Sequence, residues 1–306
     1  MRAFFRGGGR FLPHTFVFVG VMSQKIHFIS GLPRSGSTLL SALLRQNPKF
    51  HADISTPLAN LLQTNLQMMS AGTEAAQLMD EGQKPIILRA ISEAYFSTRT
   101  ERKVVFDTNR SWCAKMPLVA ELFPGSKVIA CVRDVPWVLD SLERIIRKNP
   151  FQNSRLFSGD ERATVYSRVE TLMRHDRLVG FPWAALKDAF YGEQAESLLV
   201  VDYEFLARRP AEVLKLVYTF IDEPWWDGHD FDNVEFDAPQ FDEALGLAGL
   251  HKVKPKVAFE QRKSILPPDL FAKYQGMDFW RDTAGSNAHV ITPTKPQPVE
   301  QAVGKG

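Results

Sequence analysis

The chain has 306 residues, of which 44% are hydrophobic and 24% are charged, as in an ordinary globular protein. A chain of this length suits one large α/β domain that buries most of its surface. The net charge of +2 is too small to indicate nucleic acid as a partner. Two cysteines are too few for a disulfide framework or a cysteine-based metal site, which favours a reducing, cytoplasmic location.

The two ends of the chain differ from the rest. The apolar run from Phe16 to Met22 is too short to span a bilayer, and no membrane span is expected. We expect residues 1–22 to be a disordered extension or an artefact of start-codon choice. The segment 284–306, with its Pro, Thr, Lys and Gly, is expected to be a disordered tail. Residues 23–283 are then expected to form a single domain.

The first predicted unit is a strand, a polar loop and a helix between Lys25 and Asn47. The apolar run Ile26–Ile29 suits a buried strand, and leucines at helical spacing after Thr38 mark the helix. A strand that leads through a glycine-containing loop into a helix builds an anion site from backbone N–H groups and the helix dipole.

The loop is similar to a Walker A loop but lacks its lysine. Gly31 and Gly36 have the G-x4-G spacing and Thr38 stands where the Walker Ser/Thr would, but Ser37 occupies the lysine position. The positive charge lies inside the loop, at Arg34. The Walker lysine reaches the β- and γ-phosphates of a magnesium-bound triphosphate, so its absence argues against ATP hydrolysis. An arginine within the loop favours a different anion.

Further strands alternate with helices along the chain. Apolar runs predict strands at 103–107, 127–132 and 198–202, and helical patterns cover 58–70, 84–99, 136–147, 160–191 and 210–221. This alternation predicts a three-layer α/β fold with a central parallel sheet flanked by helices. Ligands bind such sheets at the carboxyl ends of strands. The candidate site residues are therefore the polar ones that follow the strands: Arg34, Asp107, Arg133 and Tyr203.

The loop sequence GLPRSGST resembles the 5′-phosphosulfate loop of the PAPS-dependent sulfotransferases, in the form found in protein-tyrosine sulfotransferases and their bacterial relatives. PAPS is 3′-phosphoadenosine 5′-phosphosulfate. The resemblance covers most of 25–280 and implies a P-loop-like fold and sulfuryl transfer from PAPS without a metal ion. It implies that Arg34, which also serves catalysis, holds the 5′-phosphosulfate together with Ser35, Gly36, Ser37 and Thr38.

Arg133, followed by Ser141 eight residues later, resembles the family's 3′-phosphate-binding segment. An arginine makes bidentate, charge-assisted bonds to a phosphate, and a hydroxyl on the same side adds a donor. Arg144 is a third candidate, although its offset differs from that in the protein-tyrosine enzymes. The alternative for Arg133 is an ion pair with Asp134 or a helix-end charge.

Three further residues match segments of the family. Lys115 resembles a lysine that stabilises the leaving phosphate, with a surface lysine at a helix start as the alternative. Tyr203 resembles a tyrosine that contacts the nucleotide, with a plain core tyrosine as the alternative. Lys263 is the best match for a basic residue over the nucleotide, and Arg262 and Lys252 are second choices. Solvated surface lysines are the competing interpretation for this segment.

The general base is not decided by the sequence. Transfer to a hydroxyl needs a group that takes its proton. The protein-tyrosine enzymes use a glutamate after the first helix, where this chain has Ser55, with Asp53 and His51 close by. The cytosolic enzymes use a histidine after the second strand, where this chain has Asp107. We select Asp53 and leave the other three open.

These observations together predict a cytoplasmic sulfotransferase that uses PAPS and releases adenosine 3′,5′-bisphosphate, with a hydroxyl or amine as acceptor. Whether the acceptor is a peptide, a glycan, a lipid or a small molecule is not readable, nor is the oligomeric state. Two other functions stay open. One is a P-loop nucleotide kinase or NTPase with an altered loop. The other is a nucleotide-binding adaptor without catalysis, an alternative that the missing glutamate leaves open.

Overall fold

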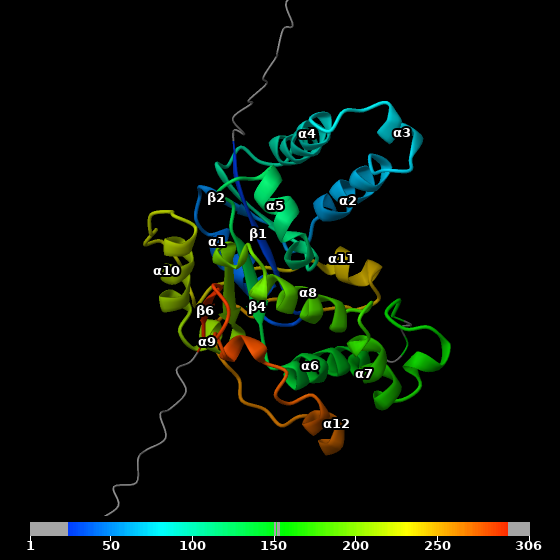
Figure 1. Cartoon of the computed structure of the whole chain (residues 1–306). Coiled ribbons are helices and arrows are strands. Elements are labelled where there is room, and N and C mark those ends of the chain that lie inside the picture. Colours follow the sequence, from blue (N-terminus) through cyan, green and yellow to red (C-terminus); the bar gives the residue numbers. More distant parts are fainter. Residues whose placement is uncertain (1–23, 150, 152–153, 293–306) are drawn as a thin grey trace, which may run out of the picture.

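A single six-stranded parallel sheet carries the fold, with helices on both of its faces (Figure 1). The computed structural model describes residues 24–149, 151 and 154–292. The strand order is β2-β3-β1-β4-β5-β6, and every pair of neighbours is parallel. The predicted three-layer α/β fold is confirmed. The predictions for 1–22 and for 293–306 lie outside the described residues.

The predicted strands correspond to four of the six observed. The strands are β1 (Lys25–Gly31), β2 (Phe50–Ala52), β3 (Val104–Thr108), β4 (Val128–Val132), β5 (Leu198–Asp202) and β6 (His289–Ile291). The sequence did not predict β2 and β6, because three residues are too few to show a strand pattern. Strand β6 also corrects the predicted tail: disorder was expected from Ala284, but 289–291 pair with β5 at the edge of the sheet.

The longer helices match the predicted ones, except that one predicted region is divided, and the four short helices at 74–77, 203–208, 239–244 and 268–273 were not predicted. They are α1 (Ser37–Leu44), α2 (Leu58–Met68), α3 (Glu74–Gln77), α4 (Gln83–Ser97), α5 (Met116–Leu122), α6 (Val135–Lys148), α7 (Val165–Met173), α8 (Gly180–Tyr191), α9 (Tyr203–Arg208), α10 (Pro210–Phe220), α11 (Pro239–Ala244) and α12 (Pro268–Lys273). The helical region predicted over 160–191 is divided into α7 and α8. At Gly180 a Cβ would overlap the carbonyl oxygens of Met173 and Arg174, so the chain folds back closely between these helices.

The central strands bury both faces of the sheet. Successive side chains of a strand point to opposite faces. Phe28 and Val128 belong to the core shared with α2, α5, α6 and α8. Ile29 and Ile129 pack on the other face with α1, α9 and α10. Burial on both faces explains why the strands are nearly continuous apolar runs.

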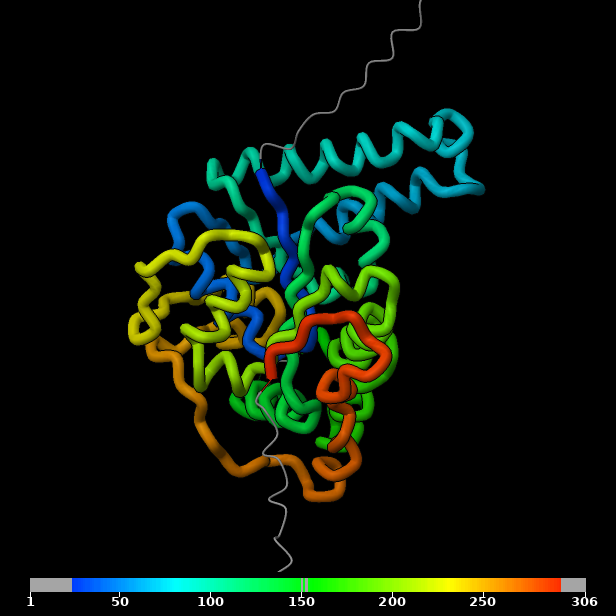
Figure 2. The backbone as a smooth tube through the Cα atoms, turned by 60° about the vertical axis from the view of Figure 1, so that its left-hand side comes forward, coloured from blue at the N-terminus to red at the C-terminus, as the bar shows by residue number. Residues whose placement is uncertain are grey.

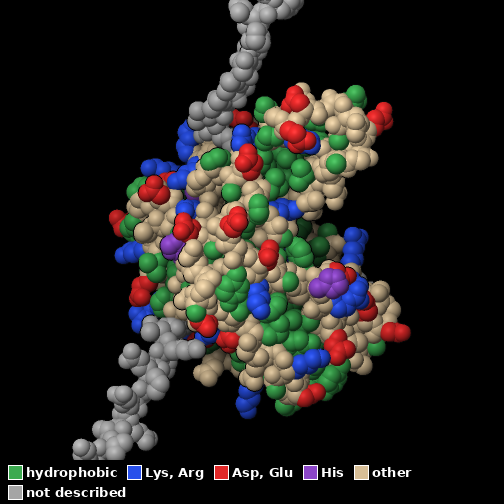
Figure 3. Space-filling view, viewed as in Figure 1, with side chains coloured by type: hydrophobic (Ala, Val, Ile, Leu, Met, Phe, Trp, Pro, Cys, Tyr) green, Lys and Arg blue, Asp and Glu red, His purple; other side chains and the backbone are tan. Residues whose placement is uncertain are grey.

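Two segments extend beyond the layered body. Helices α2, α3 and α4 form an arm on one side, and the long connection from α11 to α12, orange in Figure 2, runs along the outside of the body. Figure 3 shows acidic and basic side chains mixed over one face, with a recess beneath this arm. Among the helices that the structure describes, none is both long and apolar enough to cross a membrane.

Gly31, the last residue of β1, lies against Cys131 of β4. Its φ is +99°, and a Cβ at this position would overlap the carbonyl group of Cys131. The next residue, Leu32, donates its backbone N–H to the same carbonyl oxygen at 2.9 Å. Only glycine therefore allows the loop to leave β1 so close to β4.

We expect Gly31→Ala to destabilise the protein more than Gly72→Ala. Gly72 also has a positive φ, of 91°, but a Cβ there meets no atom within 4 Å. The Gly72 variant therefore measures backbone strain alone, about 1–2 kcal/mol. The Gly31 variant adds the overlap with β4, which costs roughly 1–3 kcal/mol more. Urea denaturation gives both free energies of unfolding, and equal losses would contradict the close approach.

Candidate active site

The carboxyl ends of β3, β1 and β4 meet at the centre of the sheet. After β1 the chain builds β2 and β3 on one side, and it later adds β4, β5 and β6 on the other. Parallel sheets bind ligands where the direction of winding reverses in this way. The loop 32–36 lies at this point and leads from β1 into α1.

The loop 32–36 is fixed by its backbone and by one buried hydroxyl. Arg34 has a φ of 58° and Gly36 a φ of 96°, both in the left-handed region. A Cβ at Gly36 would come within 2.9 Å of the ring of Tyr203. The Ser35 hydroxyl donates to the carbonyl oxygen of Cys131 at 2.7 Å. The side chain of Ser35, which we predicted to bind the cofactor, therefore attaches the loop to β4 and does not line the pocket.

A pocket of about 480 Å³ opens beside this loop. Its walls come from the loop, the first turn of α1, α6, α9 and the segment 250–262. Seven residues predicted from the sequence line it together: Arg34, Gly36, Ser37, Thr38, Arg133, Ser141 and Tyr203. Residues more than 160 positions apart in the chain thus meet in one place, because the parallel strands all end at this edge.

Arg34 reaches across the pocket towards α6. Its Nε donates to the Ser141 hydroxyl at 3.1 Å, and a terminal nitrogen donates to the carbonyl oxygen of Leu250. Burial lowers the pKa of Arg34 to about 10, and the nearby charge of Arg133 adds to this effect. Arg34 therefore stays protonated at neutral pH, and among the described residues no carboxylate forms an ion pair with it.

Arg133 leaves β4 and lies over the aromatic ring of Tyr203, with its Cζ 4.6 Å from the ring centroid. Burial lowers its pKa. The alternative in which Arg133 pairs with Asp134 is not realised, because Asp134 pairs with Arg281 at 2.8 Å. In the part of the chain that the structure describes, the Arg133 guanidinium has no hydrogen bond or ion pair.

Arg110 is a pocket residue that the sequence analysis missed. It follows β3, lines the pocket and forms no side-chain bond with another described residue, and burial lowers its pKa. The sequence predicts a strand at 103–107 and places Asp107 at its carboxyl end. Strand β3 ends at Thr108, which places Asp107 inside the sheet and Arg110 in the connection that follows. The sequence analysis considered only the residue at the strand end, so it missed this arginine two residues beyond β3.

Positive charge dominates the lining of the pocket. The basic lining residues are Arg34, Arg110, Arg133, Arg155, Lys252, Lys254, Lys256 and Arg262. Glu260 is the acidic residue among the lining side chains, and it pairs with Lys254. Arginine side chains without carboxylate partners, next to the first turn of a helix, suit a ligand with several anionic groups.

The family model described as "Sulfotransferase family" matches residues 27–227, from β1 through α10. The chain belongs to the sulfotransferase family. The resemblance predicted from the loop sequence is thereby confirmed, and the matched region includes Arg34, Arg133, Ser141 and Tyr203. The segment 245–263, which covers the pocket, lies beyond the matched residues.

Two protein-tyrosine sulfotransferases are similar to this member of the sulfotransferase family. The one from Drosophila melanogaster is 26% identical over 65% of this chain and 38% of its own length. Protein-tyrosine sulfotransferase 1 from Danio rerio is 27% identical over 69% of this chain and 56% of its own length. The chain thus spans about half the length of these relatives or less. The sulfotransferase domain from the curacin biosynthetic pathway is 18% identical, with a TM-score of 0.49 over 83% of this chain and 92% of that one.

Lys115 does not line the pocket of this sulfotransferase-family chain. It ends the 3₁₀ helix η1 (Trp112–Lys115), and its amine donates to the side-chain oxygen of Gln63 on α2. Burial lowers its pKa. Lys115 therefore lies outside the lining of the pocket, in which Arg34 and Arg110 are two of the cations.

Arg144 and Lys263 also lie outside the pocket lining. Arg144 pairs with the buried Asp140 at 2.9 Å and donates to the carbonyl oxygen of Lys263. The side chain of Lys263 is exposed. The two alternatives to Lys263, which are Arg262 and Lys252, line the pocket instead. Arg262 forms an ion pair there with Asp140 at 2.8 Å. Asp140 thus anchors the segment that carries the basic run.

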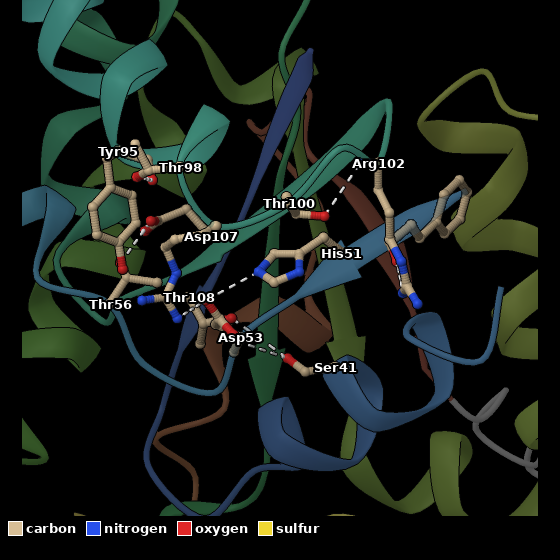
Figure 4. A network of polar contacts seen from close by, with 12 residues as sticks. Ser41, His51, Asp53, Thr56, Tyr95, Thr98, Thr100, Arg102, Asp107 and Thr108 are labelled. Carbon is tan, nitrogen blue, oxygen red and sulfur yellow. Dashed lines mark hydrogen bonds and ion pairs between the residues drawn. The ribbon is translucent and has the colours of Figure 1, made fainter. Parts of the chain in front are cut away.

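Asp53, the residue selected as general base, lies outside the pocket. Its carboxylate contacts His51 at 3.1 Å and Arg99 at 3.0 Å, and His51 does not line the pocket either (Figure 4). Burial alone would raise the pKa of Asp53, but the hydrogen bond from His51 and the charge of Arg99 outweigh it and leave the pKa lowered. Ser55 does line the pocket, but a hydroxyl is not itself a base at neutral pH.

Asp107 is a structural acid. It is fully buried in β3 and accepts a hydrogen bond from the Thr56 hydroxyl at 2.5 Å (Figure 4). It accepts a second one from Nε1 of Trp112 at 2.7 Å. Burial raises its pKa to about 7, against the effect of these two hydrogen bonds. Its carboxyl group contacts neither Arg34 nor Lys115, so the interpretation in which it holds one of them is not realised.

We expect the contribution of Asp107 to the stability of the protein to fall as the pH rises from about 4 to about 7. In this window the folded state keeps the proton of Asp107, whose pKa burial raises to about 7, whereas the unfolded state releases it near 3.8. The slope reaches about 1.4 kcal/mol per pH unit at most. Asp107→Asn keeps the shape of the side chain without the titrating proton. The free energy of unfolding of the wild type, measured in urea, should therefore fall relative to that of the variant between pH 5 and pH 7.

Asp188→Asn is the matched control, because Asp188 is exposed on α8. That variant should keep the pH dependence of the wild type. An Asp107→Asn variant with the wild-type slope would contradict the assignment of this proton to Asp107.

Proposed function

We propose that this chain transfers a sulfuryl group from PAPS to an acceptor hydroxyl or amine and releases adenosine 3′,5′-bisphosphate. The observation that carries the proposal is the meeting of Arg34, Arg110 and Arg133, none with a carboxylate partner among the described residues, at the loop after β1. Membership of the sulfotransferase family supports the same activity.

The pocket residues fit PAPS. This molecule carries negative charge at its 5′-phosphosulfate and at its 3′-phosphate. The first turn of α1, with Ser37 and Thr38, adjoins Arg34 at the loop, and Ser141 on α6 adjoins Arg133 in the same pocket. The pocket volume of about 480 Å³ lies within the range of roughly 300–1,000 Å³ that is typical of small-molecule sites.

The pocket residues bind PAPS and stabilise the negative charge that develops during the transfer. PAPS, when bound, supplies the sulfuryl group and a good leaving group. Arg34 and Arg110 lie where their charges oppose the negative charge that develops on the departing phosphate oxygen. The hydroxyls of Ser37 and Thr38 add donors, and Arg133 with Ser141 holds the second phosphate. No step in this scheme needs the lysine that the loop lacks.

The transfer is tested with sulfur-35-labelled PAPS and four acceptor classes: tyrosine peptides, glycans, lipid headgroups and small metabolites. We expect label to appear in at least one acceptor, at the same rate with and without a metal chelator. Turnover of ATP that the chelator abolishes would contradict the proposal and favour a P-loop NTPase. Binding of adenosine 3′,5′-bisphosphate without any transfer would favour a nucleotide-binding adaptor.

Arg133→Ala should weaken the binding of adenosine 3′,5′-bisphosphate by roughly 10- to 200-fold, because it removes charge-assisted hydrogen bonds worth about 1.5–3 kcal/mol. Isothermal titration calorimetry measures the loss. The same variant should bind adenosine 5′-monophosphate nearly as the wild type does, because that nucleotide has no 3′-phosphate.

Arg209→Ala is the matched control, because Arg209 is exposed and pairs with Glu212 on the surface. It should leave both affinities unchanged. If Arg133→Ala also left the bisphosphate affinity unchanged, Arg133 would not hold the 3′-phosphate.

A further inference from the structure

A histidine and an aspartate form a buried pair at the wall of the pocket, in the segment beyond the residues that the family model matches. Nδ1 of His251 lies 2.5 Å from Oδ1 of Asp242, and the backbone N–H of His251 donates to Oδ2 of the same carboxylate at 2.9 Å. Asp242 on α11 is fully buried, and His251 is 7% exposed. The carboxylate therefore holds the histidine at two points.

This pairing leaves the other ring nitrogen available. A carboxylate at Nδ1 favours the tautomer in which Nδ1 carries the proton and Nε2 carries a lone pair. Nε2 has no hydrogen bond to a described residue, and it is not among the buried polar atoms that lack a partner. Because His251 lines the pocket, Nε2 has access to it.

The pair lies beside the proposed phosphosulfate site. The residue before His251 is Leu250, whose carbonyl oxygen accepts a hydrogen bond from the guanidinium of Arg34. The charges of Arg34 and Arg110 both act on the imidazole of His251. The arginine that would hold the sulfuryl donor thus also holds the backbone next to the histidine.

The surroundings keep the imidazole neutral. Burial is the largest effect and lowers the pKa of His251. Asp242 on α11 opposes it, whereas Arg110 after β3 and Arg34 after β1 lower the pKa further. The ring of Phe241, 5.3 Å away, adds an apolar neighbour. At neutral pH the ring is therefore ready to accept a proton.

We propose that His251 is the general base of the sulfuryl transfer and that Asp242 is its positioning residue. The inference rests on the proposed function. Nε2 of His251 takes the proton of the acceptor hydroxyl while the acceptor oxygen forms its bond to sulfur. The bond from sulfur to the bridging oxygen breaks, and its electron pair stays on the 5′-phosphate of the departing adenosine 3′,5′-bisphosphate. Asp242 stabilises the imidazolium that results.

The first test compares two acceptors that differ in their need for a base. The hydroxyl of phenol is protonated at pH 8, whereas that of 4-nitrophenol is largely ionised. His251→Gln should slow transfer from labelled PAPS to phenol by roughly 10²- to 10⁴-fold and transfer to 4-nitrophenol much less. The affinity for adenosine 3′,5′-bisphosphate, measured by calorimetry, should stay at the wild-type value.

His175→Gln is the matched control, because His175 is exposed in the turn between α7 and α8. It should keep wild-type transfer to both acceptors. Wild-type transfer to phenol by the His251 variant would overturn the proposal. So would equal losses on the two acceptors, because they would indicate a purely structural role.

The second test follows the imidazole itself by NMR, without transfer. The His251 ring, assigned by its loss in His251→Gln, should titrate below 6.5 in the wild type. Asp242→Asn should move its pKa further down, because the carboxylate is the group that raises it. An unchanged pKa in this variant would overturn the pairing.

The two proposals fail in different ways. A wild-type protein that transfers label to neither phenol nor the four acceptor classes overturns the proposed function and the base with it. A wild-type protein that transfers label, with a His251 variant that does so equally well, overturns only the base.

Discussion

The contact between Gly31 and Cys131 determines where the functional groups lie. It brings the end of β1 against β4 so closely that no side chain fits between them, and the hydroxyl of Ser35 then attaches the loop to the same strand. Arg34 leaves this fixed loop with a left-handed backbone and reaches Ser141 across the pocket. A charge held by such a rigid support needs little reorganisation when an anion binds or reacts.

The acidic residues near the site explain why its arginines are available. Asp134 pairs with Arg281, Asp140 with Arg144 and Arg262, and Asp53 with Arg99. Each of these carboxylates forms its ion pair with an arginine other than Arg34, Arg110 and Arg133. The arginines that follow β1, β3 and β4 are left without carboxylate partners among the described residues, although burial lowers their pKa values and so opposes their charge. A polyanionic ligand would supply the missing partner.

The connection between α11 and α12 forms part of the pocket wall and carries His251, the proposed general base. Arg262 forms an ion pair with Asp140 of α6, and the carbonyl oxygen of Leu250 accepts a hydrogen bond from Arg34. These two contacts join the connection to the carboxyl end of the sheet. His251 follows directly after the second of these contacts. The sulfotransferase-family match covers the residues proposed to bind the phosphates and ends before this segment. The proposed base and the proposed anion site therefore lie in separately recognisable parts of the chain.

The sequence by itself determined the sheet core and several of the residues that meet at its carboxyl edge. The strands β1, β3, β4 and β5 have five or more residues and buried faces, so their apolar runs are local signals. Arg34, Arg133 and Tyr203 were predicted because parallel strands end at one edge, and Ser141 was predicted from its resemblance to a segment of the family. Only the tertiary structure decided which of the other polar residues reach that edge. Lys115 contacts Gln63, and the Lys263 side chain lies exposed outside the pocket. Asp107 lies within β3, and Arg110 of the connection after β3 lines the pocket instead. Asp242 and His251 pair across an irregular turn, where no periodic pattern indicates which side chains meet. Such contacts depend on packing between distant segments, which no local pattern records.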